Sequence, residues 1–485
     1  MTKKVFILPM LLIGIAGFAQ YSVSEISKDA YLKDFDIAVD IIKKQHPNPY
    51  RFHSKEVLDK KLDSLRKEIV KNPTYINFYL NTPTKVLGDG HSSMGTDPNY
   101  MEDFLIKTSF FPLATYVQNG NTYVNSNNKY GIEAGSRILE VNNKKISDIF
   151  NQVPKTADGS IKVEDVDMSS YISYAFSSIK EFWIKYENPK GEQKTVKLSS
   201  INYPEYIYET RHAILPTDVT ASDGIFGYQL NPATYYLIVK SFSSDESFLY
   251  ERLKKYFREM KDMKVKNLIL DIRDNGGGAI SNVPLLYSFL SKEKLFNNSY
   301  QYGTKVVDIK YKDYLIDSQT DRYYSENDIR DLDNFMQQRF DKSEKGDYYF
   351  GNTRLDNTYV KSYPRDGLFF DGKVVLITNN RTFSAATYFA SLFKAEKRGV
   401  IVGKETGSCS NFTTAAWFIT YKLPNTKSTL SIPRTEVFFN GSGNDNITKC
   451  TGVIPDYTLK TDYFMNAMKE QKDPELEFSK TLLSK

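Results

Sequence analysis

Apolar residues recur at helical spacing early in the chain, in the stretches 31–42 and 58–69, and the turn residues of 46–49 separate the two. Positions three and four apart lie on one face of a helix. The pattern therefore predicts a small helical domain over 21–105. Near its end, the segment 86–93 places two glycines before a histidine and two serines, so we expect a loop that exposes side chains.

The pattern then changes to short runs of β-branched and aromatic residues, separated by turns rich in Asn and Gly. The clearest runs are 122–124, 137–141 and 181–186. Runs of this length bounded by turn residues are typical of short strands. We predict a β-rich domain over 106–200.

From residue 201 onward, buried strands alternate with amphipathic helices, which predicts a layered α/β domain over 201–485. A polar segment rich in Tyr and Asp at about 296–368 is predicted to be an insertion that covers one edge. The predicted strands and helices of the core are 235–239, 248–260, 267–272, 283–290, 374–378, 384–394 and 399–403.

The first twenty residues have the pattern of a secretory signal peptide. Lys3 and Lys4 precede an apolar run over 5–18, and a polar segment follows at 21–24. The run is short for a membrane span, which needs about 20 apolar residues, although an uncleaved anchor stays open. We predict a signal peptide at 1–20 and an exported protein, periplasmic or secreted, with no integral membrane segment after cleavage.

Composition and charge limit the class of protein and the kinds of binding partner that we expect. Among the 485 residues, 64 basic side chains face 59 acidic ones, 40% are hydrophobic, and the formal net charge is +5. This composition excludes a disordered chain, and the absence of a long basic block makes nucleic acid an unexpected partner. The oligomeric state is left open.

A glycine-rich turn, 271–278, follows one buried strand and opens a helix. Its glycines allow backbone N–H groups to approach a ligand closely, and the helix N-terminus favours negative charge. Its spacing matches neither the GxGxxG pattern nor the GxxxxGK(S/T) pattern of phosphate-binding loops. An oxyanion hole is the interpretation we favour over a purely structural turn.

Ser384 stands between the predicted strand 374–378 and the helix that follows. A serine at a helix start usually caps the helix. The same place can instead present a nucleophilic hydroxyl, with the N–H of Ala385 ready to stabilise an oxyanion. The pattern by itself leaves both interpretations open.

These segments, in their order and spacing, resemble a family of serine peptidases that includes the carboxyl-terminal processing (tail-specific) proteases and the tricorn core protease. The resemblance implies a crotonase-like (ClpP/crotonase) catalytic core. It also implies Ser384 as nucleophile and Gly276 and Ala385 as donors of the oxyanion hole. The matching segments are 268–278, 375–390, 399–403, 406–407, 423–425 and 452–456.

Residues 131–146 resemble the core of a PDZ-like domain, with a strand, a turn and a second strand. The resemblance implies that the β-rich domain captures an extended peptide as an added strand. A β-rich spacer is the alternative.

The general base divides this family. Carboxyl-terminal processing members use a lysine 25 residues after the serine, where this chain has Cys409. Tricorn-like members use a histidine from an earlier domain, and His91, in the segment 89–93, matches that histidine loop. A histidine titrates near the pH at which a serine needs its base. The chain is thus closer to the Ser/His branch, and Lys404 matches a non-catalytic position.

The acid that would orient His91 is harder to assign. The resemblance implies a glutamate shortly before 452–456, where this chain has Lys449 and Cys450. Glu436 and Asp445 are the nearby substitutes. We favour Glu436 because it soon follows the short predicted strand 429–432.

The chain has two cysteines, Cys409 and Cys450, and the exported compartment permits either a disulfide or two free thiols. The resemblance assigns them to two sites that converge on one cleft, which favours a disulfide bracing it. No cluster has metal-ligand spacing and no dinucleotide fingerprint is present, so we expect neither metal nor cofactor.

The resemblance and the motifs together predict an exported serine endopeptidase that hydrolyses extended polypeptides with a Ser nucleophile, a His base and a backbone oxyanion hole. The missing lysine and the uncertain acid support an alternative. It is a catalytically weakened protein that binds peptides or hydrophobic ligands on the same fold.

Overall fold

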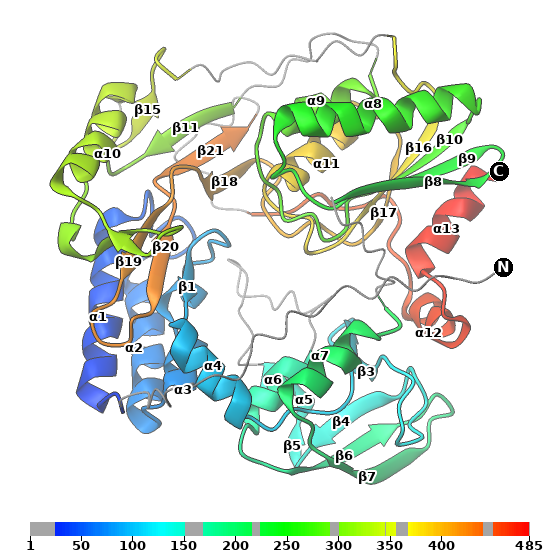
Figure 1. Ribbon diagram of the computed structural model, residues 1–485, viewed down its shortest axis with the longest axis horizontal. Coiled ribbons are helices and arrows are strands. Elements are labelled where there is room, and N and C mark those ends of the chain that lie inside the picture. The colour runs from blue at the N-terminus through cyan, green and yellow to red at the C-terminus, as the bar shows by residue number, and fades with distance from the viewer. Residues whose placement is uncertain are drawn as a thin grey trace, which may run out of the picture.

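The computed structural model describes most of the chain as four β-sheets with helices packed on them (Figure 1). The predicted signal peptide and parts of the predicted insertion lie outside the described residues. No helix in the described ranges is both long and apolar enough to cross a membrane. These ranges are 25–150, 168–215, 224–291, 300–344, 346–355, 367–439 and 450–484.

The central sheet of the α/β region has the order β17-β16-β10-β9-β8. Its first four strands in this order are parallel, and β8 pairs antiparallel with β9 at the edge. The strands are β8 (Ile225–Asn231), β9 (Thr234–Val239), β10 (Asn267–Asp271), β16 (Lys373–Thr378) and β17 (Val400–Gly403). Strands β9, β10, β16 and β17 confirm the four core strands predicted from sequence.

Both faces of this sheet are buried, which explains the continuous apolar runs of its parallel strands. In β9, Tyr235 and Leu237 pack into the larger core with the helices of one face, while Tyr236 and Ile238 join a smaller cluster on the other face. Helix α13 (Pro474–Leu483) covers that second face. The helices of the first face are α8 (Glu246–Asp262), α9 (Asn282–Ser288) and α11 (Ala385–Ala395).

A second sheet is entirely antiparallel and has the order β14-β15-β11-β21-β18. Helix α10 (Glu326–Arg339), which lies within the predicted insertion, leads into it. Its strands are β11 (Tyr300–Thr304), β14 (Phe340–Lys342), β15 (Tyr349–Gly351), β18 (Phe412–Ala415) and β21 (Thr435–Phe439).

The N-terminal helices share one hydrophobic core with a third sheet, of order β1-β20-β19-β12-β13. The helices are α1 (Lys28–Gln45), α2 (Lys55–Lys71), α3 (Tyr75–Leu80) and the 3-10 turn η1 (Pro83–Val86). The sheet comprises β1 (Ser93–Gly95), β12 (Leu315–Asp317), β13 (Arg322–Tyr323), β19 (Ile419–Lys422) and β20 (Thr429–Ile432), with the turn η2 (Lys312–Tyr314) before β12. Residues from both ends of the sequence therefore build this part of the molecule together.

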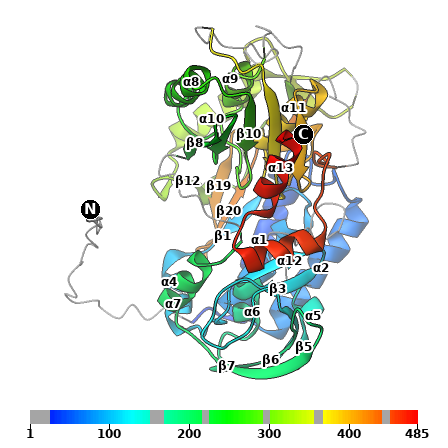
Figure 2. The same ribbon diagram turned by 90° about the vertical axis from the view of Figure 1, so that its right-hand side faces the viewer.

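The fourth sheet lies at the far end of the molecule from the parallel sheet, and helix α12 (Thr461–Glu470) packs against it (Figure 2). Its order is β2-β3-β4-β6-β7, with β5 paired to β4. Its strands are β2 (Thr115–Gln118), β3 (Asn121–Val124), β4 (Arg137–Val141), β5 (Lys144–Lys145), β6 (Glu181–Glu187) and β7 (Gln193–Ser199). The neighbouring helices are α4 (Pro98–Lys107), α5 (Ile146–Phe150), α6 (Met168–Ala175) and α7 (Tyr203–Arg211).

A buried carboxylate on α1 fixes the hairpin formed by β19 and β20. Asp34 has no exposed surface and accepts hydrogen bonds from the backbone N–H groups of Asn425 and Thr426 and from both side chains. Strand β1 pairs with β20 of this hairpin. Asp34 thereby helps to position the segment that precedes β1.

We predict that Asp34→Ala lowers the free energy of unfolding by about 3 kcal/mol, because several buried donors lose a charged acceptor. Thermal and urea unfolding measure this loss. Asp36→Ala is the matched control, since Asp36 pairs with Arg66 on the surface and such pairs contribute about 1 kcal/mol or less. An equal effect of the two substitutions would contradict the assignment.

Candidate active site

Ser384 sits in a strained turn between β16 and α11. The helix begins at Ala385, and Ser384 adopts φ 54° and ψ −122° without a capping bond from its side chain. A positive φ is unfavourable for a residue with a Cβ and persists where the surrounding structure enforces it. The capping interpretation of Ser384 is therefore wrong, and its hydroxyl is available for another contact.

That contact is made with His91. The Nε2 atom of His91 lies 3.0 Å from the Oγ of Ser384, although the two residues are 293 positions apart. The ring of His91 packs on that of Phe383, with centroids 4.7 Å apart. Gly90 makes this approach possible, because a Cβ there would lie 2.5 Å from a ring carbon of Phe383.

The opposite ring nitrogen of His91 faces two oxygen atoms. Its Nδ1 lies 3.3 Å from the Oγ1 of Thr413 and 3.9 Å from the Oδ1 of Asp89. When Nε2 accepts the proton of Ser384, Nδ1 carries the ring hydrogen and donates it to Thr413. Burial lowers the pKa of His91 below its usual value, against a smaller opposing effect of Asp89. The ring is thus neutral and able to accept a proton at neutral pH.

Asp89 is itself held in a chain of hydrogen bonds. The backbone N–H of Asn48 donates to Nδ1 of His46, so Nε2 of His46 carries the hydrogen that faces Asp89 at 3.1 Å. Asp89 also accepts from the backbone N–H of His91 and the hydroxyl of Ser92. Burial acts to raise the pKa of Asp89, but its bond to His46 and the two nearby histidines lower it below the usual value. The carboxylate stays charged and fixes the histidine loop.

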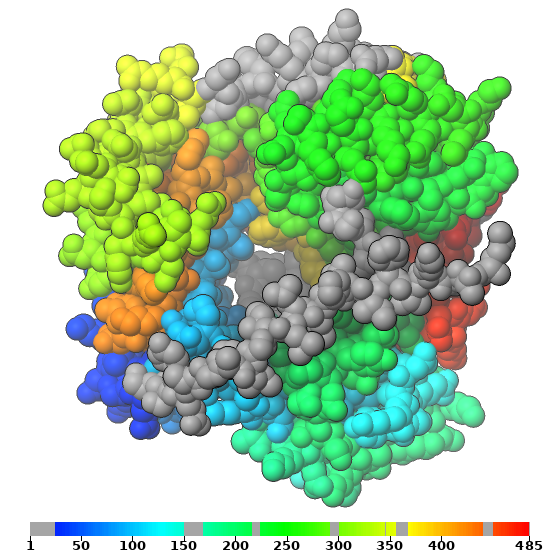
Figure 3. All heavy atoms as spheres, viewed as in Figure 1, coloured from blue at the N-terminus to red at the C-terminus, as the bar shows by residue number. Residues whose placement is uncertain are grey.

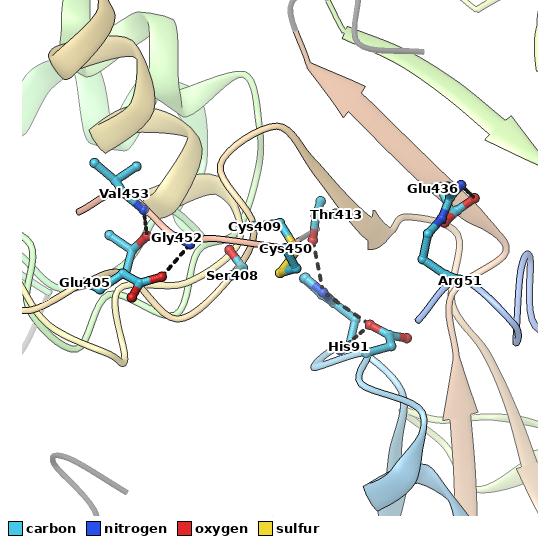
Figure 4. Close-up of a disulfide and its surroundings, with 12 residues drawn as sticks. Arg51, His91, Glu405, Ser408, Cys409, Thr413, Glu436, Cys450, Gly452 and Val453 are labelled. Atoms are coloured by element: carbon cyan, nitrogen blue, oxygen red, sulfur yellow. Dashed lines mark hydrogen bonds and ion pairs between the residues drawn. A yellow bond between two sulfur atoms is a disulfide. The ribbon is translucent and has the colours of Figure 1, made fainter. Parts of the chain in front are cut away.

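The structure does not bring Glu436 to His91. In the pairing of β18 with β21, Thr413 lies opposite Val437, so the side chain of the adjacent Glu436 projects from the other face of the sheet. Glu436 is fully buried there and forms two 2.7 Å bonds with Arg51 (Figure 4). It also accepts a hydrogen bond from Tyr348. This corrects the sequence prediction that Glu436 orients the histidine.

The glycine turn packs directly against the serine turn. Gly277 has φ +97°, and a Cβ on it would lie 2.7 Å from the Cβ of Ser384. Its N–H donates to the side chain of Asn275, whereas the N–H groups of Gly276 and Ala385 have no hydrogen-bond partner in the described ranges. Gly276 is exposed. The two N–H groups predicted to form an oxyanion hole are therefore available.

A charged network ties these two turns together. Asp274 accepts hydrogen bonds from Asn379 and Arg381, and its backbone N–H donates to the side-chain oxygen of Asn379. Burial acts to raise the pKa of Asp274, but Arg381 and Lys240 outweigh it and lower the pKa to about 2. The backbone N–H of Phe383 also donates to the carbonyl of Asn275. The glycine turn and the serine turn thus form one unit.

Cys409 and Cys450 are joined by a disulfide, with their Cα atoms 4.8 Å apart. Figure 4 shows it close to His91. Both half-cystines line a cleft of about 350 Å³ that His91 also lines. The neighbouring Ser408 accepts a 2.8 Å hydrogen bond from the backbone N–H of Ser384. The disulfide therefore braces the segment that holds the serine turn.

Sequence reasoning did not assign roles to Asp89, Thr413 and His46. Asp89 was in the histidine motif, and its place two residues before His91 is the signal that points to it. Thr413 has no such signal, because its contact depends on strand register.

Lys404 is buried and donates to the hydroxyl of Tyr116. No group of His, Cys, Asp and Glu in the described ranges has the geometry of a metal site.

The comparisons with known proteins point to a class of protein. Residues 234–459, a little under half of the chain, match the model of peptidase family S41, and this match supports a peptidase of that family.

Two solved structures are similar along nearly the whole chain. The structure of mature CPAF complexed with lactacystin has a TM-score of 0.59 at 14% identity, covering 94% of this chain and 97% of that one. Mature CPAF alone gives 0.58 at 14% identity, covering 94% and 96%. These likenesses show a shared fold. No curated protein matches the sequence.

We predict that replacing both cysteines by alanine lowers the free energy of unfolding by about 4 kcal/mol, since the disulfide closes a loop of 41 residues. Thermal unfolding with and without reductant measures the effect. The parent should lose stability on reduction, whereas the double variant should not respond. A parent that unfolds at the same temperature in both conditions would exclude a stabilising disulfide.

Proposed function

We propose that this protein is an exported serine endopeptidase in which Ser384 attacks the peptide carbonyl and His91 is the general base. The observation that carries the proposal is the 3.0 Å contact between Ser384 Oγ and His91 Nε2, combined with the strained conformation of Ser384. A hydroxyl of ordinary pKa becomes nucleophilic when an adjacent base takes its proton.

The further steps follow from the surrounding groups. As Ser384 attacks, the proton moves from its Oγ to His91 Nε2, and the resulting imidazolium is stabilised by the charge of Asp89 and the hydroxyl of Thr413. The N–H groups of Gly276 and Ala385 donate to the carbonyl oxygen as it becomes negative. His91 then returns the proton to the leaving amine, and water releases the acyl group by the same route.

We also propose which parts of the chain form the catalytic core and the peptide-binding domain. The parallel sheet with its two helical faces forms the crotonase-like core over 201–485, and residues 106–200 form a PDZ-like domain that captures extended chains. The six-stranded sheet β2–β7 supports the latter assignment. The N-terminal apolar run and the disulfide both support export into an oxidising compartment.

A weakened, peptide-binding protein is the second candidate function. One observation favours it, because Thr413 rather than a carboxylate makes the closest contact to His91 Nδ1. Weaker orientation and charge stabilisation of the imidazolium would lower turnover while leaving the binding surfaces intact.

We predict that the parent cleaves casein and that Ser384→Ala and His91→Ala each reduce kcat/KM by about 10³-fold or more, because either change removes proton transfer from the serine. Hydrolysis of labelled casein measures this. His212→Ala is the matched control, since that histidine is exposed at the end of α7. No cleavage by the parent, with peptide binding retained, would favour the second candidate.

The pH dependence of kcat/KM provides a separate prediction. His91 acts only when neutral, and its pKa lies below the usual value of 6.5 because it is buried, with Asp89 opposing. The acidic limb of the profile should therefore have its midpoint below pH 6.5, as the ring becomes protonated. An acidic limb centred above pH 6.5 would contradict this environment for His91.

A further inference from the structure

One of the side chains that line the cleft beside His91 is a lysine that has no role in the proposed reaction. Lys85, in the turn η1, lines this cleft together with His91, Cys409 and Cys450. The space-filling view shows the molecule hollowed near its centre, between the blue segment around β1 and the gold segment around α11 (Figure 3). Lys85 and the proposed base therefore border the same cleft, which is partly open to solvent.

The charge of Lys85 is poorly compensated. Its side chain is mostly buried, and its Nζ donates one 2.6 Å hydrogen bond, to the carbonyl of Leu80. The ring of Tyr79 lies 5.9 Å from Nζ. No carboxylate in the described ranges forms an ion pair with it, and burial lowers the pKa of Lys85 to about 8. An ammonium group carries three donors, and only one of them has a protein partner in the described ranges.

The other charged side chain that lines the cleft does not neutralise Lys85. Asp89 is 3% exposed, and its oxygens accept from Ser92, from the backbone of His91 and from the His46 side chain. The remaining lining consists largely of hydroxyls and aromatic rings, among them Thr82, Thr84 and Phe412. Within the described ranges, the cleft thus presents one positive group without an anionic partner, in a lining that also contains hydroxyl groups.

We propose that Lys85 binds a carboxylate of the polypeptide substrate and so determines which segment is held beside His91. This proposal rests on the proposed peptidase function. A carboxylate would supply the missing counter-charge and accept the free ammonium donors, and charge-assisted bonds of this kind are stronger than neutral ones. The carboxylate comes from an acidic side chain or from the free carboxyl end of the substrate, since both have the same chemistry.

A purely structural role would leave Lys85 as a cation at the C-terminal end of α3, where backbone carbonyls carry partial negative charge. That role explains the bond to Leu80. It predicts no dependence of peptide binding on carboxylates, which gives the experiment its contrast.

The test measures binding of three fluorescent peptides of equal length to the Ser384→Ala protein, which cannot hydrolyse them by the proposed route. One peptide has an internal Glu and an amidated end, the second has Gln and an amidated end, and the third has Gln and a free carboxyl end. We expect at least one carboxylate peptide to bind about ten-fold or more tightly than the neutral one. The peptide that shows this difference identifies the source.

The same measurements on Lys85→Met in this background should abolish the difference. Lys71→Met is the matched control, because Lys71 is exposed on α2 and its loss changes the net charge equally. Lys85→Gln, which can still donate to Leu80, gives the same readout if the Met variant does not fold. Equal binding of all three peptides by the parent background, or a difference that survives loss of Lys85, would overturn the proposal.

Failure of the proposed function is distinguishable from failure of this inference. Binding to the Ser384→Ala protein does not depend on catalysis, whereas casein hydrolysis by the parent reports catalysis alone. A carboxylate preference without hydrolysis keeps the role of Lys85 and rejects the peptidase mechanism. Hydrolysis without a carboxylate preference does the reverse.

Discussion

The contact between His91 and Ser384 joins two segments that are 293 positions apart, so it exists only when the N-terminal helices and the α/β region occupy their correct relative positions. The shared core of the helices and the sheet β1-β20-β19-β12-β13 fixes this relation. Strand β1 follows His91 almost immediately and pairs with β20. The position of His91 therefore depends on strands from the C-terminal half of the chain as well as on the N-terminal helices.

Three carboxylates, two of them buried and one half-buried, support this one contact from different directions. Asp34 anchors the hairpin that pairs with β1, Asp89 fixes the histidine loop, and Asp274 links the glycine turn to the serine turn. Burying any of these carboxylates without partners would cost free energy. The hydrogen bonds that each one accepts offset the cost of removing it from water. Ser384 carries backbone strain, with φ 54° and ψ −122°, and a reactive group is expected to carry such strain.

Much of the architecture could be predicted from sequence, because parallel strands buried on both faces and amphipathic helices leave strong periodic patterns. Ser384 and His91 were also predictable, since each lies in a short motif. Thr413 was not, because its approach to His91 depends on the register of β18 against β21. The same register directs Glu436 to the opposite face, toward Arg51, and nothing in the local sequence of Glu436 records which face it occupies.

The central claim is that His91 activates Ser384, and covalent labelling of the serine by a fluorophosphonate tests it most directly. The account predicts that mass spectrometry finds the label on Ser384 in the parent and that the labelling rate falls about 10²-fold or more in His91→Ala, because the serine loses its base. Labelling of Ser384 at the same rate in both proteins, or no labelling of the parent, would contradict it.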